Sequence, residues 1–281
     1  MPIIAVLIIY VGLLAFLYPT VAGWFSQVNQ SRLIESYSET VTGDLDPSAA
    51  EQLALAHAYN DALSTGAVLE ENERLPTGQG VSSDDTLDYW SILRATPLEV
   101  MARLRIPAID VDLPIYHGTS DATLALGVGH LQGTSLPVGG PGTRAVLTAH
   151  RGLASAVLFT HLNQVEVGDT FTIEVLGEVL SYRVRDTQVI DPEDTERLRA
   201  EPGKDLVTLV TCTPLGINSQ RILVTGERIL PTPAADEAAA GEVPDVAGFP
   251  WWAVWLIGAL VAGVGYIVYA GLPRRRSADE D

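Results

Sequence analysis

Two long stretches without a charged residue lie near the ends of this sequence, at residues 2–24 and 249–270. About 20 consecutive apolar residues are enough for a helix to cross the hydrocarbon core of a membrane. The chain is therefore expected to carry two membrane segments with a separately folded part between them. The first stretch has a second interpretation, a cleaved signal peptide, but it lacks the basic flank and the short apolar core that are typical of one.

The second stretch has the side-chain pattern of a membrane-spanning helix. Tryptophans crowd its first end and tyrosines its last, and amphipathic aromatic residues prefer the two headgroup regions. Three arginines follow at 274–276, and a positive flank favours the cytoplasmic side. If both stretches span the membrane, both termini are cytoplasmic and residues 25–248 lie on the extracellular side.

The part between the membrane segments divides by composition. Residues 25–97 are acidic, and Asp46-Pro47-Ser48 followed by Glu51 predicts a helix with proline in its first turn. This region is expected to be a helical extension that ends in an exposed loop, before a main domain at residues 98–230. Residues 231–248 are rich in Pro, Ala and acidic residues and are expected to be a flexible stalk. The membrane helix at 249–270 and a cytoplasmic tail at 271–281 follow.

Residues 98–230 have the texture of a mainly β domain. Short apolar runs alternate with Gly and Pro, which is typical of strands separated by turns. Gly177-Glu178, between the runs 170–176 and 179–189, is expected to be a hairpin turn. Short strands at close spacing indicate a mainly antiparallel barrel or sandwich.

The charge balance argues against some classes of partner. The formal net charge is −18, and an acidic chain is repelled by nucleic-acid phosphates. No spacing of His, Cys, Asp and Glu typical of a metal site occurs. We therefore expect no nucleic-acid partner, no metal and no cofactor.

Cys212 is the only cysteine of the chain. A lone cysteine is more often a small buried apolar residue than a reactive one. Cys212 follows an apolar, β-branched run, and Pro214 cannot continue a central strand, so its thiol is expected at the end of a strand. His150 ends a second apolar run, and Arg221 opens the strand after the loop 213–220. A nearby cation or base would activate such a thiol, but the pattern alone does not choose His150 over His130.

Three segments resemble one known family. The stretch TLVTCTPLGINSQRILVTGER at 208–228 is similar to the active-site strand and loop of sortases, with an Arg nine residues after the Cys. AVLTAHRG at 145–152 resembles their catalytic-His motif, and 106–142 resembles the strands that precede it in the pilus-assembling class C subgroup. The resemblance covers roughly residues 98–230. It implies an eight-stranded β-barrel of the sortase type, with a helical extension and two transmembrane helices added here, and a covalent acyl-enzyme.

The resemblance also implies roles for single residues. Cys212 would be the nucleophile, His150 the general acid and base, and Arg221 the cationic donor to the oxyanion. Thr211 would add a donor for the substrate, or only pack as a strand residue. A class C lid, an Asp-Pro-aromatic segment over the Cys, would correspond to Asp88 and Trp90, with Tyr in place of Pro; the alternative is that Trp90 only anchors its loop against the barrel.

Three functions remain open at this stage. The leading one is a pilin polymerase that cleaves an L-P-x-T-G-like sorting signal and joins its Thr to a Lys amine of the next pilin. The second is a housekeeping sortase that anchors surface proteins to a cell-wall amine. The third is a non-catalytic, membrane-tethered binding protein on the same barrel, which an intact Cys212, His150 and Arg221 set disfavours.

Overall fold

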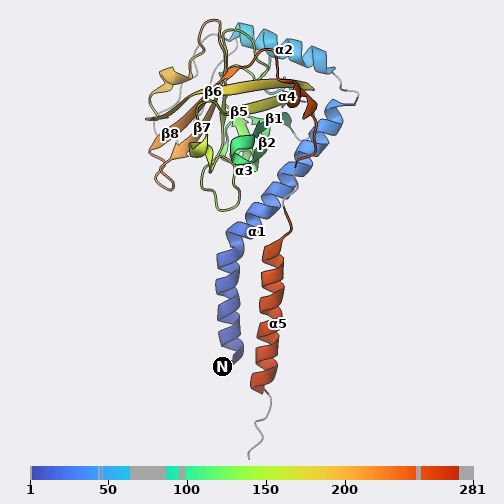
Figure 1. Cartoon of the computed structure of the whole chain (residues 1–281), viewed down its shortest axis with the longest axis vertical. Coiled ribbons are helices and arrows are strands. Elements are labelled where there is room, and N and C mark those ends of the chain that lie inside the picture. The colour runs from blue at the N-terminus through green and yellow to red at the C-terminus, as the bar shows by residue number, and fades with distance from the viewer. Residues whose placement is uncertain are drawn as a thin grey trace, which may run out of the picture.

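The structure of the chain is a computed structural model that describes residues 2–43, 45, 47–63, 87–94, 99–244 and 248–271. A compact β domain lies at one end, and two long helices run side by side away from it (Figure 1). The basic residues 274–276, most of the predicted tail 271–281, Asp46 and the acidic loop 64–86 lie outside the described residues.

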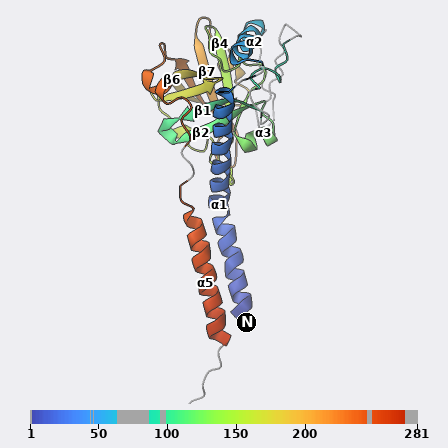
Figure 2. The same cartoon turned by 90° about the vertical axis from the view of Figure 1, so that its right-hand side faces the viewer.

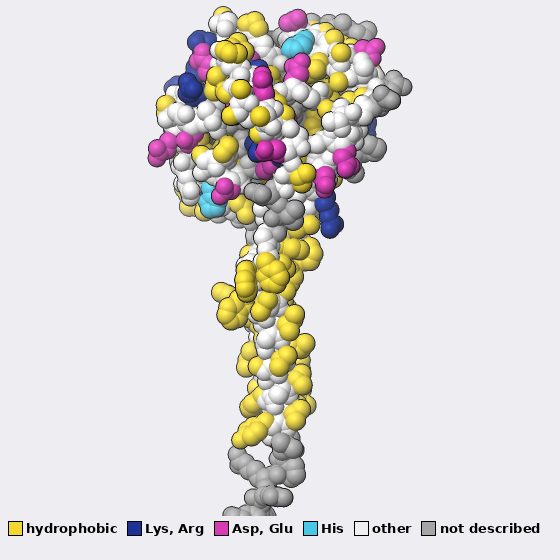
Figure 3. All heavy atoms as spheres, turned by 45° about the vertical axis from the view of Figure 1, so that its right-hand side comes forward, with side chains coloured by type: hydrophobic (Ala, Val, Ile, Leu, Met, Phe, Trp, Pro, Cys, Tyr) yellow, Lys and Arg dark blue, Asp and Glu magenta, His cyan; other side chains and the backbone are white. Residues whose placement is uncertain are grey.

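The two long helices are α1, Pro2–Val41, and α5, Trp251–Gly271. Both are long and apolar enough to cross a membrane, and the face of the paired segments that Figure 3 draws carries hydrophobic side chains and no charged ones. The helices stay together when the view is turned by 90° (Figure 2). The Tyr10 hydroxyl donates to the Ala259 carbonyl at 2.6 Å, and Trp24 Nε1 donates to the Gly248 carbonyl at 2.8 Å. The two apolar helices therefore contact each other directly.

Helix α1 does not end with its apolar stretch. It continues past Trp24 to Val41, bends along the way (Figure 1), and contains Pro19, a residue type that bends helices. Its outer part docks on the β domain, where the Tyr37 hydroxyl donates to the Met101 carbonyl at 3.2 Å and accepts from the Leu176 amide at 2.9 Å. The membrane segment and the helical extension are thus one rod, without a break at residue 24.

Helix α2 spans Ala49–Ala62 and begins close to the predicted position. Ser48 is its N-cap and forms a capping box with Glu51, which satisfies two backbone amides at the helix start. Pro47 therefore precedes the cap, one step earlier than the expected first turn. The Asn60 side chain fixes the helix to the β domain, because its amide donates to the Leu136 carbonyl and accepts from the Leu136 amide.

Eight strands close into a barrel in the order β1-β2-β3-β4-β7-β8-β6-β5. The pairs β2–β3 and β4–β7 are parallel and the other six are antiparallel. This confirms the predicted mainly β fold and decides for a barrel over a sandwich. The strands are β1 Val100–Ile106, β2 Val111–His117, β3 Val128–His130, β4 Thr143–Thr148, β5 Thr170–Val175, β6 Glu178–Ile190, β7 Asp205–Thr213 and β8 Gln220–Arg228. Short helical turns connect them: η1 Pro107–Ile109, α3 Asp121–Leu126, η2 Leu162–Gln164 and η3 Thr195–Leu198.

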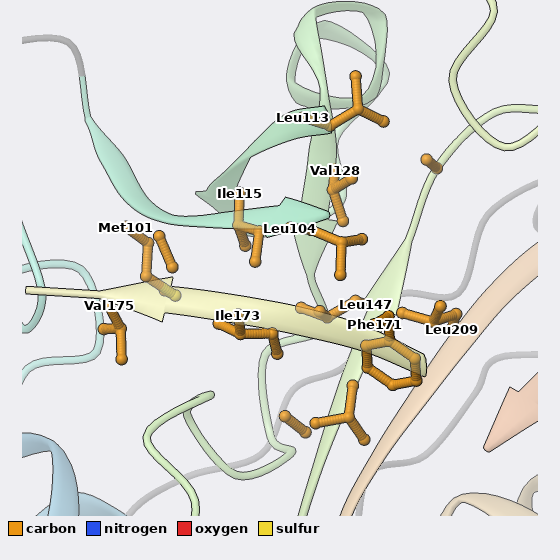
Figure 4. Close-up of a cluster of buried hydrophobic side chains, with 14 of the residues drawn as sticks. Met101, Leu104, Leu113, Ile115, Val128, Leu147, Phe171, Ile173, Val175 and Leu209 are labelled. Atoms are coloured by element: carbon orange, nitrogen blue, oxygen red, sulfur yellow. The ribbon is translucent and has the colours of Figure 1, made fainter. Parts of the chain in front are cut away.

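The core fills the barrel with side chains from alternate strand positions. Met101, Ile115, Leu147, Ile173 and Leu209 converge inside it (Figure 4). The hairpin between β5 and β6 is confirmed, although its turn residues are Leu176 and Gly177, with φ of 47° and 88°. Two consecutive positive φ values are the signature of the turn that matches strand twist.

The segment 231–244, which we name the C-terminal strap, differs from the flexible stalk expected for 231–248. It carries helix α4, Ala234–Ala238, and packs along the outside of the barrel. The Arg103 side chain is only 1% exposed, so its guanidinium needs several acceptors, and the strap supplies one. The bonds between strap and barrel include Arg103 Nη1 to Glu242 O, Arg105 Nη1 to Ala239 O, Gly241 N to Glu174 Oε2 and Ser181 Oγ to Asp236 Oδ2.

Candidate active site

Cys212 and Arg221 lie directly opposite each other on neighbouring strands. The antiparallel register of β7 and β8 pairs these two residues, and residues directly opposite in such a ladder have their Cβ atoms about 4.5–5.5 Å apart. The loop 214–219 joins the strands just beyond them. The expected placement of both residues at the ends of consecutive strands is therefore what the structure has.

His150 follows the end of β4, which is the other neighbour of β7. The two strands are parallel, with Thr148 level with Val210, and the Ala149 amide still donates to the Val210 carbonyl at 3.3 Å. His150 lies two residues beyond the last paired residue of β4, and Cys212 lies two residues beyond Val210, so the register places the two at the same level. The barrel thus presents His150, Cys212 and Arg221 at one end of three adjacent strands.

Thr211 ties two of these strand ends together. Its side chain is buried, and its hydroxyl donates to the Ala149 carbonyl at 2.8 Å. The donor that was expected to serve a substrate is therefore engaged within the protein. The packing role, the alternative weighed for this residue, is the one its contacts support.

The Cys212 thiol is partly buried. Burial raises its pKa, and the charge of Arg221 opposes that rise. Arg221 is itself buried, with Nη1 donating to the carbonyls of Asn218 at 2.9 Å and Gln220 at 3.1 Å. The guanidinium is thereby fixed by its own loop, beside the sulfur whose thiolate it favours.

Burial lowers the pKa of His150, and the charge of Asp121 works in the opposite direction. With the thiol pKa raised and the imidazole pKa lowered, the resting pair is a neutral thiol and a neutral imidazole at pH 7. Asp121 begins helix α3 and was missed by sequence reasoning, because it lies 29 positions before His150 in the chain. Only the folded barrel brings its charge close enough to be felt.

The other histidines are placed differently. His130 is completely buried; its Nδ1 lies 3.0 Å from the Tyr89 hydroxyl, its Nε2 lies 2.8 Å from the Ser135 carbonyl, and burial lowers its pKa to about 4. His117 is also buried, with Nε2 2.7 Å from the Ile92 carbonyl. Both are therefore structural residues that hold the segment 87–94, whereas His57 and His161 are exposed.

The candidate lid residues lie on that same segment. Asp88 accepts from the backbone amide of Trp90 at 3.2 Å, and the Trp90 ring lies 5.0 Å from the Tyr89 ring and 6.1 Å from the His117 ring. A Cβ on Gly118 would come within 2.8 Å of the Trp90 ring. These contacts favour the anchoring alternative, and the lid stays a prediction.

Among the described residues, no group of three or more His, Cys, Asp and Glu side chains is arranged to hold a metal ion. The chemistry that the site offers is that of a thiol, an imidazole and a guanidinium. A thiolate attacks acyl carbonyls, an imidazole moves protons, and fixed cationic donors stabilise an oxyanion. The arrangement suits acyl transfer.

Comparison with known proteins agrees with this chemistry. A family model described as a sortase domain matches residues 104–229. Sortase A of Streptococcus agalactiae is 30% identical over 166 residues, which are 57% of this chain and 66% of that protein. Sortase D of Bacillus subtilis is 29% identical over 129 residues, 45% of this chain and 62% of that protein. The chain thus matches just under two thirds of the length of these curated relatives.

Solved structures match over more of their length. Sortase C-1 from Actinomyces oris has a TM-score of 0.59 and 49% sequence identity, covering 64% of this chain and 97% of that one. Streptococcus pneumoniae sortase C has a TM-score of 0.62 and 39% identity, covering 70% of this chain and 96% of that one. These shares exceed the length of the barrel, so the similarity extends beyond it.

Proposed function

This chain belongs to the sortase family, and from that membership we propose that it is a membrane-anchored cysteine transpeptidase that assembles pili. It cleaves an L-P-x-T-G-like sorting signal between Thr and Gly and passes the Thr carbonyl to a Lys amine of the next pilin. The observation that carries the proposal is the placement of Cys212, opposite Arg221 and level with His150, at one end of the barrel. Catalytic roles for these three residues are part of the proposal.

In the first half of the reaction, the Cys212 sulfur attacks the Thr carbonyl as a thiolate. The carbonyl oxygen becomes an oxyanion, which the Arg221 guanidinium stabilises. The imidazolium of His150 gives its proton to the nitrogen of the departing Gly. The Thr–Gly amide bond breaks, and a thioester between the Thr carbonyl and Cys212 remains.

In the second half, an amine takes the place of the departed Gly. His150, now neutral, accepts a proton from the incoming Lys amine. The amine nitrogen attacks the thioester, a new amide bond forms, and the Cys212 thiolate leaves. The chain then returns to its starting state without a cofactor.

The two protonation states matter for the rate. Burial raises the pKa of Cys212 and lowers that of His150, so the reactive thiolate–imidazolium pair is a minor form of the resting site. The thiolate–imidazolium pair carries the same number of protons as the neutral thiol–imidazole pair. The fraction of sites in the reactive form is therefore independent of pH between the pKa of His150 and the pKa of Cys212.

The pilus assignment rests on similarity to solved structures named sortase C, one of which is described in terms of pilin substrate specificity. A housekeeping role, in which a cell-wall amine replaces the Lys, is favoured by the 30% identity to a protein named sortase A. Both share the same thioester. The non-catalytic alternative predicts no thioester at all.

The anchoring proposal follows from the two apolar helices. Both would cross the cell membrane, leaving the barrel and its site outside and both ends of the chain in the cytoplasm. The docking of α1 through Tyr37 and of the C-terminal strap through Arg103 would attach the barrel to both anchors. A substrate that is itself held in the membrane would then present its sorting signal at a matching height.

The choice of acceptor distinguishes the two enzymatic roles. The full chain in detergent is given a sorting-signal peptide together with equal concentrations of a pilin Lys-containing domain and a cell-wall stem peptide. We expect the product to be an amide to the pilin Lys. Exclusive transfer to the stem peptide would replace the pilus role by the housekeeping one, and the Cys212→Ala variant controls for uncatalysed coupling.

A further inference from the structure

Arg151, the residue after His150, makes hydrogen bonds with all three nitrogens of its guanidinium. Nε donates to the Thr160 carbonyl at 3.2 Å, Nη1 to Thr213 Oγ1 at 3.0 Å, and Nη2 to Asn163 Oδ1 at 2.9 Å. Thr160 and Asn163 belong to the loop that follows His150, whereas Thr213 follows Cys212. The planar, five-donor fork of arginine suits a site where several acceptors lie at fixed angles.

The bond from Arg151 to Thr213 has a counterpart on the other side of the site. Before His150 and Cys212, the Thr211 hydroxyl donates to the Ala149 carbonyl at 2.8 Å. After them, Arg151 donates to the Thr213 hydroxyl at 3.0 Å. One side-chain bond thus joins the residues just before the two functional side chains, and another joins the residues just after them.

These bonds take over where the backbone ladder stops. Strand β4 ends at Thr148, and the last described ladder-like bond runs from the Ala149 amide to the Val210 carbonyl. At the level of His150, the backbone bends away, because the His150 carbonyl accepts from the Phe159 amide at 3.1 Å. The side-chain bonds through Thr211 and Thr213 therefore connect the end of β4 to β7 beyond the bond from Ala149 to Val210.

The loops around the pair also touch directly. Gly152 has a φ of +73°, and a Cβ at this position would lie 2.4 Å from the Leu215 side chain. The Leu215 side chain, which follows Cys212, therefore packs against the Gly152 backbone, which follows His150. Arg151 bridges the same two segments, so its bond to Thr213 closes this end of the site.

We propose that Arg151 and Thr213 form a positioning pair that fixes the separation of His150 and Cys212. This inference rests on the proposed transpeptidase function, since it assigns the pair to the proton transfer at the Gly and Lys nitrogens. The charge that acts on the thiol comes from Arg221, so Arg151 acts by geometry rather than as a second cation. A misplacement of about 1 Å between reacting groups lowers a rate by roughly 100-fold.

The test compares variants on both sides of the bond. Arg151→Lys keeps the charge but offers one ammonium to three acceptors, and Thr213→Val removes the acceptor of Nη1 at nearly constant shape. Each is expected to lower kcat by about 10- to 100-fold with little change in KM. Thr213→Ser keeps the hydroxyl and is expected to recover most of the rate. Arg185→Lys, on the far part of β6 with ion pairs to Glu201 and Glu227, is the matched control and should keep the wild-type rate.

Two readouts separate positioning from loss of folded protein. The amount of Cys212 that iodoacetamide alkylates at completion counts folded sites and needs no sorting signal, and this end-point should stay at the wild-type value in both variants. In the double variant, kcat per folded site should be no lower than in the poorer single variant, because both changes break the same bond.

Three results would overturn the proposal: a wild-type kcat in Arg151→Lys, multiplicative losses in the double variant, or an alkylation end-point that falls in parallel with kcat. A wild-type chain that never forms a thioester would instead refute the proposed function, and this inference with it. An active wild type with an equally active Arg151→Lys would refute the inference alone.

Discussion

The contact between α1 and the barrel gives a prediction that isolates one oxygen atom. Tyr37→Phe removes the hydroxyl that donates to the Met101 carbonyl and accepts from the Leu176 amide. Tyr37 is 3% exposed, so water does not replace either bond. The change leaves one buried carbonyl and one buried amide without a partner, in a packed site that the phenyl ring continues to fill.

The expected cost follows from these two groups. A buried polar group left unpaired costs about 1–3 kcal/mol, so the two together should lower the free energy of unfolding by about 2–6 kcal/mol. For a domain of this size, that corresponds to a fall in Tm of roughly 4–24 °C. The measurement is thermal unfolding of the full chain in detergent, followed by circular dichroism in the near ultraviolet.

Tyr59→Phe is the matched control. Tyr59 is 1% exposed, and its hydroxyl has no hydrogen-bond partner among the described residues. Removing that oxygen leaves no group newly unpaired, so the Tm should stay the same or rise. The reasoning is refuted if Tyr37→Phe costs no more than Tyr59→Phe, since the two hydroxyls would then contribute equally despite their different partners. Faster hydrogen exchange at the Leu176 amide in Tyr37→Phe alone would locate the effect.

Three other predictions concern the site and its setting. Burial lowers the pKa of His150 below its ordinary 6.5 and raises the pKa of Cys212 above its ordinary 9.0. The value of kcat/KM should therefore be flat between pH 6.5 and 9, with an acid limb below pH 6.5 and an alkaline limb above pH 9. A narrow optimum inside that range would contradict both pKa directions. In intact cells, an added protease should reach the outer part, residues 25–248, and spare a tag fused after Asp281; a tag cut from outside would reverse the orientation. Replacing Asp88 and Trp90 together by Ala should lower the Tm and leave the rate of Cys212 alkylation unchanged. This is the result expected if the two residues anchor their loop against His117 and Gly118. Faster alkylation of Cys212 in the double variant would instead support a lid.

The strand ends that carry the site were predictable because local signals mark them. A β-branched run followed by Cys212 and Pro214 indicates where a strand stops, and the same holds for the run before His150. The closing order of the barrel was not predictable in this way. The parallel pair β4–β7 joins segments about 60 residues apart in the chain, the pair β2–β3 joins neighbouring strands in parallel rather than as a hairpin, and strand periodicity predicts neither pairing.

The two ends of the outer part show what composition leaves out. The first apolar stretch stops at Trp24, where the composition changes from apolar to polar. The helix itself continues to Val41, because no second proline follows Pro19 within it. The C-terminal strap looks too polar to pack when read alone. Its binding partners are charges on the barrel, Arg103 and Glu174, whose burial exists only after folding.

The histidines illustrate the same limit within the site. His130 and His150 both follow or end apolar runs, and periodicity treats them alike. In the fold, His130 is enclosed by Tyr89 and Ser135, whereas His150 lies at the open end of the barrel, level with Cys212. The family resemblance selects His150 over His130, and this choice stays a prediction, because the motif carries tertiary information that periodicity lacks.

The central claim, that Cys212 opposite Arg221 and level with His150 forms an acyl-enzyme, is tested most directly by intact-mass spectrometry. The full chain in detergent is mixed with a peptide that contains an L-P-x-T-G sorting signal and quenched in acid within seconds. The account predicts that the wild-type chain gains the mass of the peptide up to its Thr, on Cys212, and that Cys212→Ala gains nothing. An unmodified wild-type chain after peptide cleavage, or the same adduct on Cys212→Ala, would contradict it.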